Sequence, residues 1–480
     1  MDKKKLQRIA CVGLCALLTF AVGCSGAPDE TYVKNSDVGG KTPHVVVTPG
    51  ANEVEISKKE ELTESQTYAP KYTFDYLGDD VMPKGAWNTP PYSSIASDNY
   101  LKAEYFQAYA EAGLNFMPDY FMNAQSPEVS TAIKLAEQNG LVYLSGDANK
   151  HAGIGDVAMV KTNLQRVSSA PNFGGVLAVD EPGFDDFPLL GQVHTAYKTA
   201  YKDMMMFINL LGISTSDVSK YKEGFSGANV DPVKYDYRTD YVDKYVEQVS
   251  PEVLVYDYYP CVGKFPAVQP DYFNNLSEIS DAARENDIPF WPYIQLCSWN
   301  TASRICTQAE ISWQVNCALA YGAKGLMYFM FWTPPDNPGE QYTGCMISRQ
   351  GEKQDTYYSV QNVNASVQAV EMYLLNSRFQ GVICVGESPA AIPAREQLTT
   401  YGTYKNSVGV PHITGCFDYM GKDAYYMVCN SIEKGGTVRM NFDADKEYTV
   451  IYRGVEYKTN GLMSFDVNAG EGVLIIENEE

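Results

Sequence analysis

Histidine and paired cysteine motifs are scarce in this chain, and their scarcity argues against a metal centre. The 480 residues include only four histidines, His44, His151, His194 and His412, and no two of them stand at the spacing of metal ligands. The 11 cysteines include no C-x-x-C pair, so the sequence indicates neither a zinc ribbon nor a thioredoxin-like redox motif. We therefore expect no metal, and no motif indicates a cofactor.

Positive charge is also in short supply, because 37 Lys and Arg stand against 59 Asp and Glu. The formal net charge of −22 repels phosphate groups, which argues against binding of nucleic acid or of an anionic lipid surface. Tyrosine, in contrast, is abundant at 36 residues. A tyrosine ring has an apolar face and a polar tip, which suits amphipathic ligands such as sugars, although most single tyrosines pack inside a protein.

The chain lacks an N-terminal apolar run of membrane-spanning length. The run IACVGLCALLTFAV follows the basic segment MDKKKLQR, and it is too short for a comfortable span. It ends in Ala21-Val22-Gly23-Cys24, and small residues before a cysteine resemble the lipobox of bacterial lipoproteins, with Ala21 where Leu is usual. The resemblance implies a signal peptide over residues 1–24 and lipid on Cys24, with a plain secretory signal as the alternative. We expect an extracytoplasmic protein that meets the membrane only through this anchor, to which each buried methylene contributes about 0.8 kcal/mol.

The remaining cysteines do not form the pattern of a disulfide scaffold. Cys11 and Cys15 leave with the signal peptide, and the other eight after Cys24 are scattered. Those in apolar runs, such as Cys317 and Cys429, are expected to be buried thiols.

Composition and periodicity divide the rest of the chain into three parts. Residues 25–70 are polar and are expected to be a flexible linker. Over residues 71–378, eight apolar runs alternate with amphipathic segments, and near-continuous apolar runs are typical of parallel strands that are covered on both faces. The runs are MPKGAW, LNFMPDYF, LVYLSGD, GGVLAVDE, MMFINLL, EVLVYDYYP, PFWPYIQL and GLMYFMFW.

Eight strand–helix repeats over roughly 250 residues predict a (β/α)8 barrel. A doubly wound sheet is the alternative, but GAWNTPPYSS after the first strand is not a glycine-rich phosphate turn. Residues 379–480 contain short strands separated by turn residues, such as ITGCFDYM and GVLIIEN, and predict a C-terminal β-sandwich.

Helix boundary signals support the barrel pattern. Ser126 before a proline predicts a helix start, and Gly140 predicts its end. Thr307 and Glu310 form a capping box before another apolar face. Residues 354–377 are expected to form the final barrel helix.

Active sites of such barrels lie at the carboxyl ends of the strands. In this chain those ends carry carboxylates, amides and aromatic rings with few cations, which suits a neutral sugar. The candidate residues are Trp87, Asp119, Asp147, Asp180, Glu181, Asn209, Asp257, Tyr258, Gln295, Trp299 and Trp332, with His151 just beyond the third strand.

The tripeptide Asp-Glu-Pro at 180–182 resembles the fourth-strand signature of the (β/α)8 glycoside hydrolases of the clan-A type. The run LAYGAKGLMYFMFW (residues 319–332) is similar to the segment before the last strand in bacterial surface glycosidases. The likeness covers the chain from about residue 70 to its end. It implies hydrolysis of O-glycosidic bonds in an external oligo- or polysaccharide, with Glu181 as general acid/base. The alternative for Glu181 is a solvated strand end.

The seventh strand departs from that family, because it ends in Gln295 where many members have a nucleophilic glutamate. Three alternatives follow. Asp257 supplies the second carboxylate, or a substrate acetamide group that Asp180 steadies serves as the nucleophile. In the third alternative, the protein is a catalytically inactive glycan-binding lipoprotein. Neighbouring strand residues point to opposite faces, so Asp180 and Glu181 both reach the barrel interior only through a twist or a bulge. We therefore expect Asp257 to be the partner of Glu181.

A solute-binding lipoprotein of a transporter is a further alternative. It requires two similar α/β lobes, and the all-β C-terminal segment argues against it.

Overall fold

The computed structural model describes residues 68–91, 99–147, 162, 164–213 and 235–478, together with the backbone of 45–47 and 52–54. The chain divides into two compact units, Met1–Gly40 and Lys41–Glu480, and every described residue belongs to the second. The predicted signal peptide, Cys24, most of the predicted linker and His151 lie outside the described residues. Within the described part of the chain, no helix is long and apolar enough to cross a membrane.

Eight parallel strands close into a barrel, which confirms the predicted (β/α)8 architecture and excludes the doubly wound sheet. The neighbours follow sequence order, and the last strand pairs with the first. Each strand overlaps one of the predicted apolar runs. The strands are β3 (Lys84–Ala86), β4 (Phe116–Pro118), β5 (Val142–Ser145), β6 (Phe173–Asp180), β7 (Met205–Leu210), β8 (Leu254–Asp257), β9 (Phe290–Gln295) and β10 (Leu326–Phe329).

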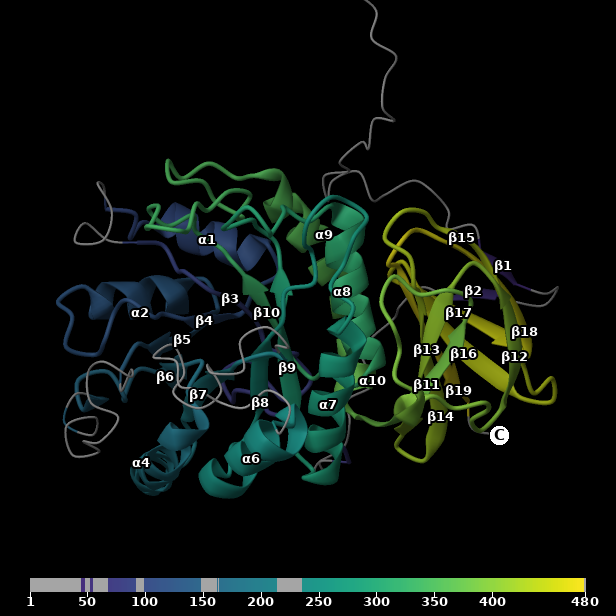
Figure 1. Cartoon of the computed structure of the whole chain (residues 1–480), viewed down its shortest axis with the longest axis horizontal. Coiled ribbons are helices and arrows are strands. Elements are labelled where there is room, and N and C mark those ends of the chain that lie inside the picture. The colour runs from purple at the N-terminus through teal and green to yellow at the C-terminus, as the bar shows by residue number, and fades with distance from the viewer. Residues whose placement is uncertain are drawn as a thin grey trace, which may run out of the picture. The chain divides into compact units, whose positions relative to one another are not determined.

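Helices enclose this barrel (Figure 1). Among the described residues, the α-helices are α1 (Ala103–Glu111), α2 (Val129–Gln138), α4 (Phe187–Ala200), α6 (Asp243–Val249), α7 (Tyr272–Glu285), α8 (Gln308–Ala320), α9 (Asp355–Gln368) and α10 (Glu371–Leu375). Shorter helical segments are η2 (Phe184–Asp186), η4 (Arg238–Val242) and η5 (Ala394–Glu396). The helix predicted over residues 354–377 is therefore interrupted between α9 and α10.

The capping signals have mixed outcomes. The box before α8 is confirmed, because the Glu310 backbone N–H donates to Thr307 Oγ1 at 3.2 Å and the Thr307 N–H donates to Glu310 Oε2 at 2.9 Å. The start predicted at Ser126 is wrong, since α2 begins at Val129 with no side-chain cap. Gly140 follows the end of α2 with a φ of 68°, a value that glycine adopts without strain.

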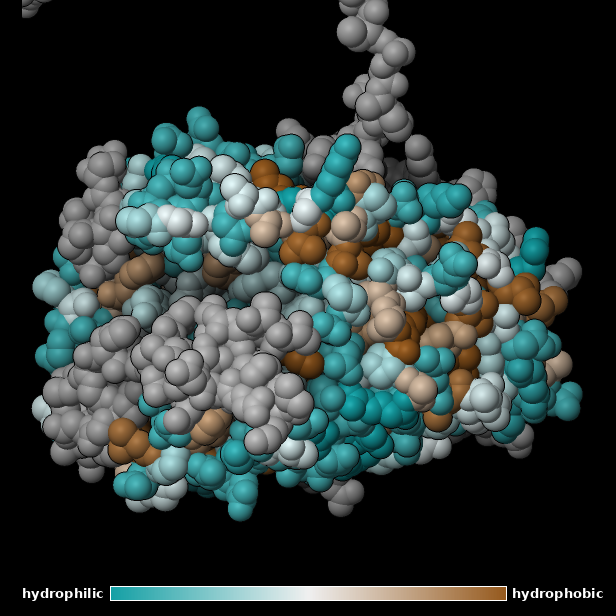
Figure 2. All heavy atoms as spheres, viewed as in Figure 1, coloured by the Kyte–Doolittle hydropathy of each residue, from teal (hydrophilic) through white to brown (hydrophobic). Residues whose placement is uncertain are grey.

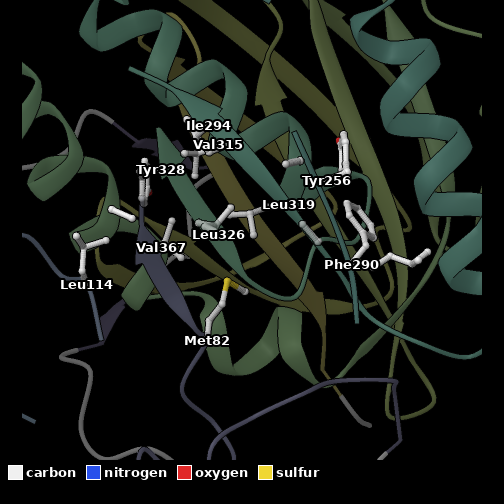
Figure 3. Packing of buried hydrophobic residues seen from close by; sticks show 14 of the residues in the cluster. Met82, Leu114, Tyr256, Phe290, Ile294, Val315, Leu319, Leu326, Tyr328 and Val367 are labelled. Carbon is white, nitrogen blue, oxygen red and sulfur yellow. The ribbon is translucent and has the colours of Figure 1, made fainter. Parts of the chain in front are cut away.

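Two layers of apolar side chains surround the strands. The outer layer includes strand residues such as Tyr256, Ile294 and Tyr328 and helix residues such as Val315 and Leu319 of α8, which all belong to one buried cluster (Figure 3). The inner layer fills the barrel with alternate residues of the strands. Its buried strand members are Phe116, Val142, Leu144, Leu177, Met205, Phe207, Val255, Trp291, Tyr293 and Met327. Their alternation shows which positions of each strand face the barrel axis.

The C-terminal region consists of two antiparallel sheets, which confirms the predicted sandwich. Side chains from both sheets form one core. One sheet has the order β1 (Val45–Val47), β18 (Leu462–Val467), β15 (Gly436–Phe442) and β12 (Tyr404–Gly409). The other has the order β11 (Ser377–Val385), β13 (His412–Tyr419), β14 (Lys422–Cys429), β19 (Gly472–Glu477), β16 (Glu447–Tyr452), β17 (Val455–Asn460) and β2 (Asn52–Val54). Strands β1 and β2 come from the segment that the sequence assigns to the linker.

Buried hydrogen bonds join α8 to this sandwich. The Trp313 indole donates to Asn430 Oδ1 at 2.8 Å, the Tyr426 hydroxyl donates to Asn316 Oδ1 at 2.7 Å, and the Asn316 amide donates to the Gly470 carbonyl at 2.7 Å. These buried polar groups are therefore satisfied across the junction. On the face shown in Figure 2, hydrophobic residues form small groups separated by hydrophilic ones, a pattern that is ordinary for a protein surface.

Candidate active site

An irregularity in β6 decides which of its residues face the barrel axis. Leu177 pairs with Phe207 of β7, but Val179 pairs with the next residue, Ile208, so Ala178 is an extra residue in β6. Such a bulge reverses the alternation of side chains beyond it. Leu177 faces the axis, and the bulge makes Val179 face the surrounding helices.

Asp180 consequently points into the barrel. It pairs in register with the interior-facing Asn209, whose amide donates to Asp180 Oδ1 at 3.0 Å. Glu181 follows with a φ of 46°, a left-handed conformation that is uncommon for a residue with a side chain. Its carboxyl group hydrogen-bonds that of Asp257 at the end of β8. The bulge and the left-handed residue thus bring both adjacent acids to the same side, and Asp257 joins them.

The three acids form a carboxyl cluster, defined as Asp180, Glu181 and Asp257, in which the two aspartates have raised pKa values. Burial, and then the negative charge of Asp180, raises the pKa of Asp257 to about 7, although hydrogen bonds with Glu181 and Tyr259 oppose the shift. Burial raises the pKa of Asp180 to about 6, against the opposing hydrogen bond of Asn209. Two ionised carboxylates have no hydrogen to share, so the bond between Glu181 and Asp257 requires a proton. Near neutral pH the cluster therefore combines a protonated carboxyl group with negative charge.

Aromatic rings surround the carboxyl cluster. Tyr259 hydrogen-bonds Asp257, and Tyr293 of β9 pairs in register with Asp257. The buried Tyr293 hydroxyl has no hydrogen-bond partner among the described residues. Burial, and then the negative charges of Asp180 and Asp257, raise the pKa of this phenol. The Trp87 ring lies 5.1 Å from that of Tyr120 and 6.2 Å from that of Tyr293. These rings reduce solvation of the acids, which is the physical cause of their raised pKa values.

The two predicted tryptophan platforms differ in exposure. Trp299 is half-buried, and its ring lies 5.0 Å from that of Tyr259. Trp332 is only 3% exposed, because Tyr100 and Tyr105 pack on it at ring distances of 4.6 and 5.0 Å. It still lines a cavity of about 530 Å³ with residues that follow β3, β4 and β10. Trp332 therefore acts mainly as a wall of this cavity rather than as an open stacking surface.

Asp119 and Asp147 belong to the framework of the loops instead of the carboxyl cluster. The fully buried Asp119 accepts hydrogen bonds from the backbone N–H groups of Phe121 and Met122 at 2.9 and 3.1 Å. Asp147 is also buried and accepts one from the Ala124 N–H at 2.8 Å. Their carboxylates satisfy backbone donors in the loops that follow β4 and β5.

Tyr258 also lies away from the carboxyl cluster. Its ring is 6.3 Å from that of Tyr272 of α7, on the outer side of the barrel. The neighbouring Tyr259 takes the place that the sequence assigns to Tyr258. Both tyrosines follow the last residue of β8, Asp257, so strand alternation could not identify which of them faces the acids.

Gln295 has a structural task that explains the absence of a carboxylate at this strand end. Its fully buried Oε1 accepts from the Cys261 N–H at 2.7 Å, and Nε2 donates to the carbonyls of Cys261 and Arg304 at 3.0 and 3.2 Å. The amide offers donors and an acceptor in this shape, whereas an ionised carboxylate offers acceptors alone. Gln295 therefore fixes the segment after β8, next to Asp257, and its side chain is committed to backbone groups.

We expect Gln295→Glu to lower the free energy of unfolding by roughly 3 kcal/mol or more, because a buried carboxylate would face carbonyl oxygens that now accept hydrogen bonds. Chemical denaturation at neutral pH measures this loss. Gln341→Glu, at an exposed position, is the control and should change stability little. A stable Gln295→Glu variant with increased glycan hydrolysis would contradict the structural role.

One group of potential metal ligands occurs among the described residues. The Sγ atoms of Cys261 and Cys306 and a carboxylate oxygen of Glu310 lie within 4.8 Å of one another. Glu310 already forms an ion pair with Arg304 and caps α8 through Thr307. Structural zinc sites have four ligands, and a guanidinium group beside the third ligand opposes a cation. We assign no metal to this group.

No protein-family model matches the chain, and no curated protein matches it in sequence. Among solved structures, a family 5 glycoside hydrolase from Bacteroides vulgatus is similar over 83% of this chain and 90% of its own, with 10% identity and a TM-score of 0.49. A β-galactosidase from a psychrophilic Marinomonas matches over 60% of each chain, with 11% identity and a TM-score of 0.43, so this chain spans less than two thirds of that enzyme. An endo-β-1,3-glucanase from Sorangium cellulosum matches over 58% of this chain and 98% of its own, with 11% identity and a TM-score of 0.36. At these values the likenesses carry no argument about activity.

Proposed function

We propose that the protein is a glycoside hydrolase that cleaves O-glycosidic bonds of a neutral oligo- or polysaccharide. The observation that carries this proposal is the carboxyl cluster, which lies among aromatic rings at the carboxyl end of the barrel strands and holds a proton near neutral pH. Glycoside hydrolysis needs one protonated carboxyl group and one negatively charged group on the two sides of the scissile bond. Lipid attachment at Cys24 would hold the protein outside the cytoplasmic membrane, where such glycans can reach the barrel from solution.

The environments of the three acids suggest their roles. Glu181 is the more exposed member of the hydrogen-bonded pair, since Asp257 is only 8% exposed. In the proposed mechanism Glu181 protonates the leaving oxygen, and Asp257 keeps the proton available to it. Asp180, oriented by the Asn209 amide, supplies the negative charge that stabilises the cationic transition state. Trp87 and Tyr120 offer apolar faces for the sugar ring.

The test is to incubate the purified protein with a panel of neutral host and plant glycans and to follow released sugars by mass spectrometry. We expect release of sugars from at least one neutral glycan. Binding without release would instead favour a glycan-binding protein on a barrel scaffold. Absence of both binding and release would contradict the proposal as a whole.

A further inference from the structure

Two buried thiols meet where the segment after β8 approaches the segment before α8. The Sγ atoms of Cys261 and Cys306 lie within 4.8 Å of each other, and the two residues are 0% and 5% exposed. Both face the same group, because Nε2 of Gln314 lies 3.8 Å from one sulfur and 3.7 Å from the other. The pair is therefore enclosed by protein and oriented toward a common point.

The backbone holds the two segments together independently of the thiols. Val262 and Ser303 form an antiparallel bridge, and the Arg304 N–H donates to the Cys261 carbonyl at 3.2 Å. The side-chain amide of Gln295 also forms hydrogen bonds with the backbone N–H and carbonyl of Cys261. A disulfide needs an S–S distance of about 2.05 Å, so the two sulfurs, which lie within 4.8 Å of each other, must approach further for the bond to form.

Other uses of this pair fit the surroundings less well. Arg304 neutralises Glu310, the third potential metal ligand, which leaves two thiols without the remaining ligands that zinc requires. Cys297 also interacts electrostatically with Cys306, but its thiol hydrogen-bonds Cys345 in a separate buried cluster.

We propose that Cys261 and Cys306 form a disulfide bond when the chain folds in the presence of a low-molecular-weight disulfide such as oxidised glutathione. One cysteine thiolate attacks the glutathione disulfide, a mixed disulfide forms, and the first glutathione thiol leaves. The second cysteine thiolate then displaces the other glutathione. Two electrons pass from the cysteine pair to glutathione, and the two thiol protons end on the released glutathione or in solution. The reaction belongs to folding, since the folded protein buries both sulfurs.

The bond would tie the segment that follows Asp257 and Tyr259 to the start of α8. It therefore restrains one side of the barrel mouth by a covalent link, in addition to the Gln295 hydrogen bonds. This inference stands on the two cysteines alone and does not depend on whether the protein hydrolyses glycans.

The experiment refolds the full chain from denaturant, either in a mixture of oxidised and reduced glutathione or in dithiothreitol. The products are alkylated in denaturant and analysed by peptide mass spectrometry. After oxidative refolding, we expect a cross-linked peptide pair that contains Cys261 and Cys306, with Cys416 still alkylated. The midpoint temperature of thermal unfolding should be several degrees higher than in the reduced sample, and dithiothreitol should reverse that increase.

Cys261→Ser should remove both the cross-link and the thermal shift. Cys416→Ser is the matched control, because that thiol is also buried but lies 3.7 Å from the Thr414 carbonyl, and it should leave both unchanged. The comparison of oxidised and reduced parent protein keeps the test valid if a variant fails to fold. Full alkylation of Cys261 and Cys306 after oxidative refolding would overturn the proposal. A cross-link of either residue to another cysteine would also overturn it. Protection of both thiols from alkylation by zinc in the reduced protein would do the same.

Discussion

Glu181→Gln should lower kcat for glycan release by a factor of about 10²–10⁴, which is the usual effect of removing a general acid. The amide has nearly the same shape as the carboxyl group and can still hydrogen-bond Asp257, so the folded structure should persist. It cannot deliver a proton to the leaving oxygen. KM should change much less than kcat, since the substitution removes an interaction of the transition state.

Steady-state kinetics on the most responsive neutral glycan of the panel measures this effect, and thermal unfolding confirms that the variant is folded. Asp185→Asn is the matched control, because Asp185 is an exposed acid of the same loop, in η2, and its loss should leave kcat within about twofold. Retention of full activity by Glu181→Gln would remove Glu181 from the mechanism. Equal losses in both variants would point to disruption of the loop instead.

Asp257→Asn should affect activity and stability in opposite directions. Activity should fall by at least a hundredfold, because the pair loses the group that holds its proton. The pKa of Asp257 rises from 3.8 to about 7 on folding, so the folded state favours the protonated form. The stability that this preference supplies is complete below about pH 4 and is lost as the pH rises through about 7. Asparagine is always neutral and avoids that loss.

At pH 8 we therefore expect the variant to be more stable than the parent by roughly 2 kcal/mol or more, since one pKa unit corresponds to about 1.4 kcal/mol. At pH 4 the two proteins should be nearly equal. Urea denaturation at both pH values measures the difference. Asp445→Asn, at an exposed position of the sandwich, should show no such pH-dependent gain. A variant that is less stable than the parent at pH 8 would show that the Asp257 carboxylate is favoured on folding.

Much of the fold follows from local sequence patterns. Each barrel strand is a short apolar run, and buried parallel strands require such runs wherever they occur. Strands β12 and β17 are harder to predict, because they mix exposed polar residues with few buried ones, as in YKNSVG and VEYKTN. Ser126 shows the limit of capping signals, since the turn before α2 takes up the residues that a cap would need.

The site is less predictable, because its geometry depends on the backbone conformation of single residues, such as the bulge at Ala178 and the left-handed Glu181. Asp257 and the pair at 180–181 stand out as acids at strand ends, and the chain brings them together. The bulge at Ala178 leaves no mark in the sequence, and strand alternation alone assigns Asp180 to the wrong face. The role of Gln295 is equally hidden, since its partners are backbone groups of segments distant in sequence. Tyr259 and Tyr293 could not be identified from the sequence, because their role depends on their positions beside the buried acids.

The extra residue in β6 also bears on how roles are transferred between related barrels. A gapless alignment over Asp-Glu-Pro would place Glu181 on the glutamate of another barrel and Asp180 on the residue before it. In a regular strand the glutamate faces the axis, whereas here the aspartate does so and the glutamate reaches the same side only through its left-handed backbone. Identical letters at this motif can thus describe two different spatial orders of acids. Assignments carried from one barrel to another should count residues from the last regular strand pair instead of from the proline.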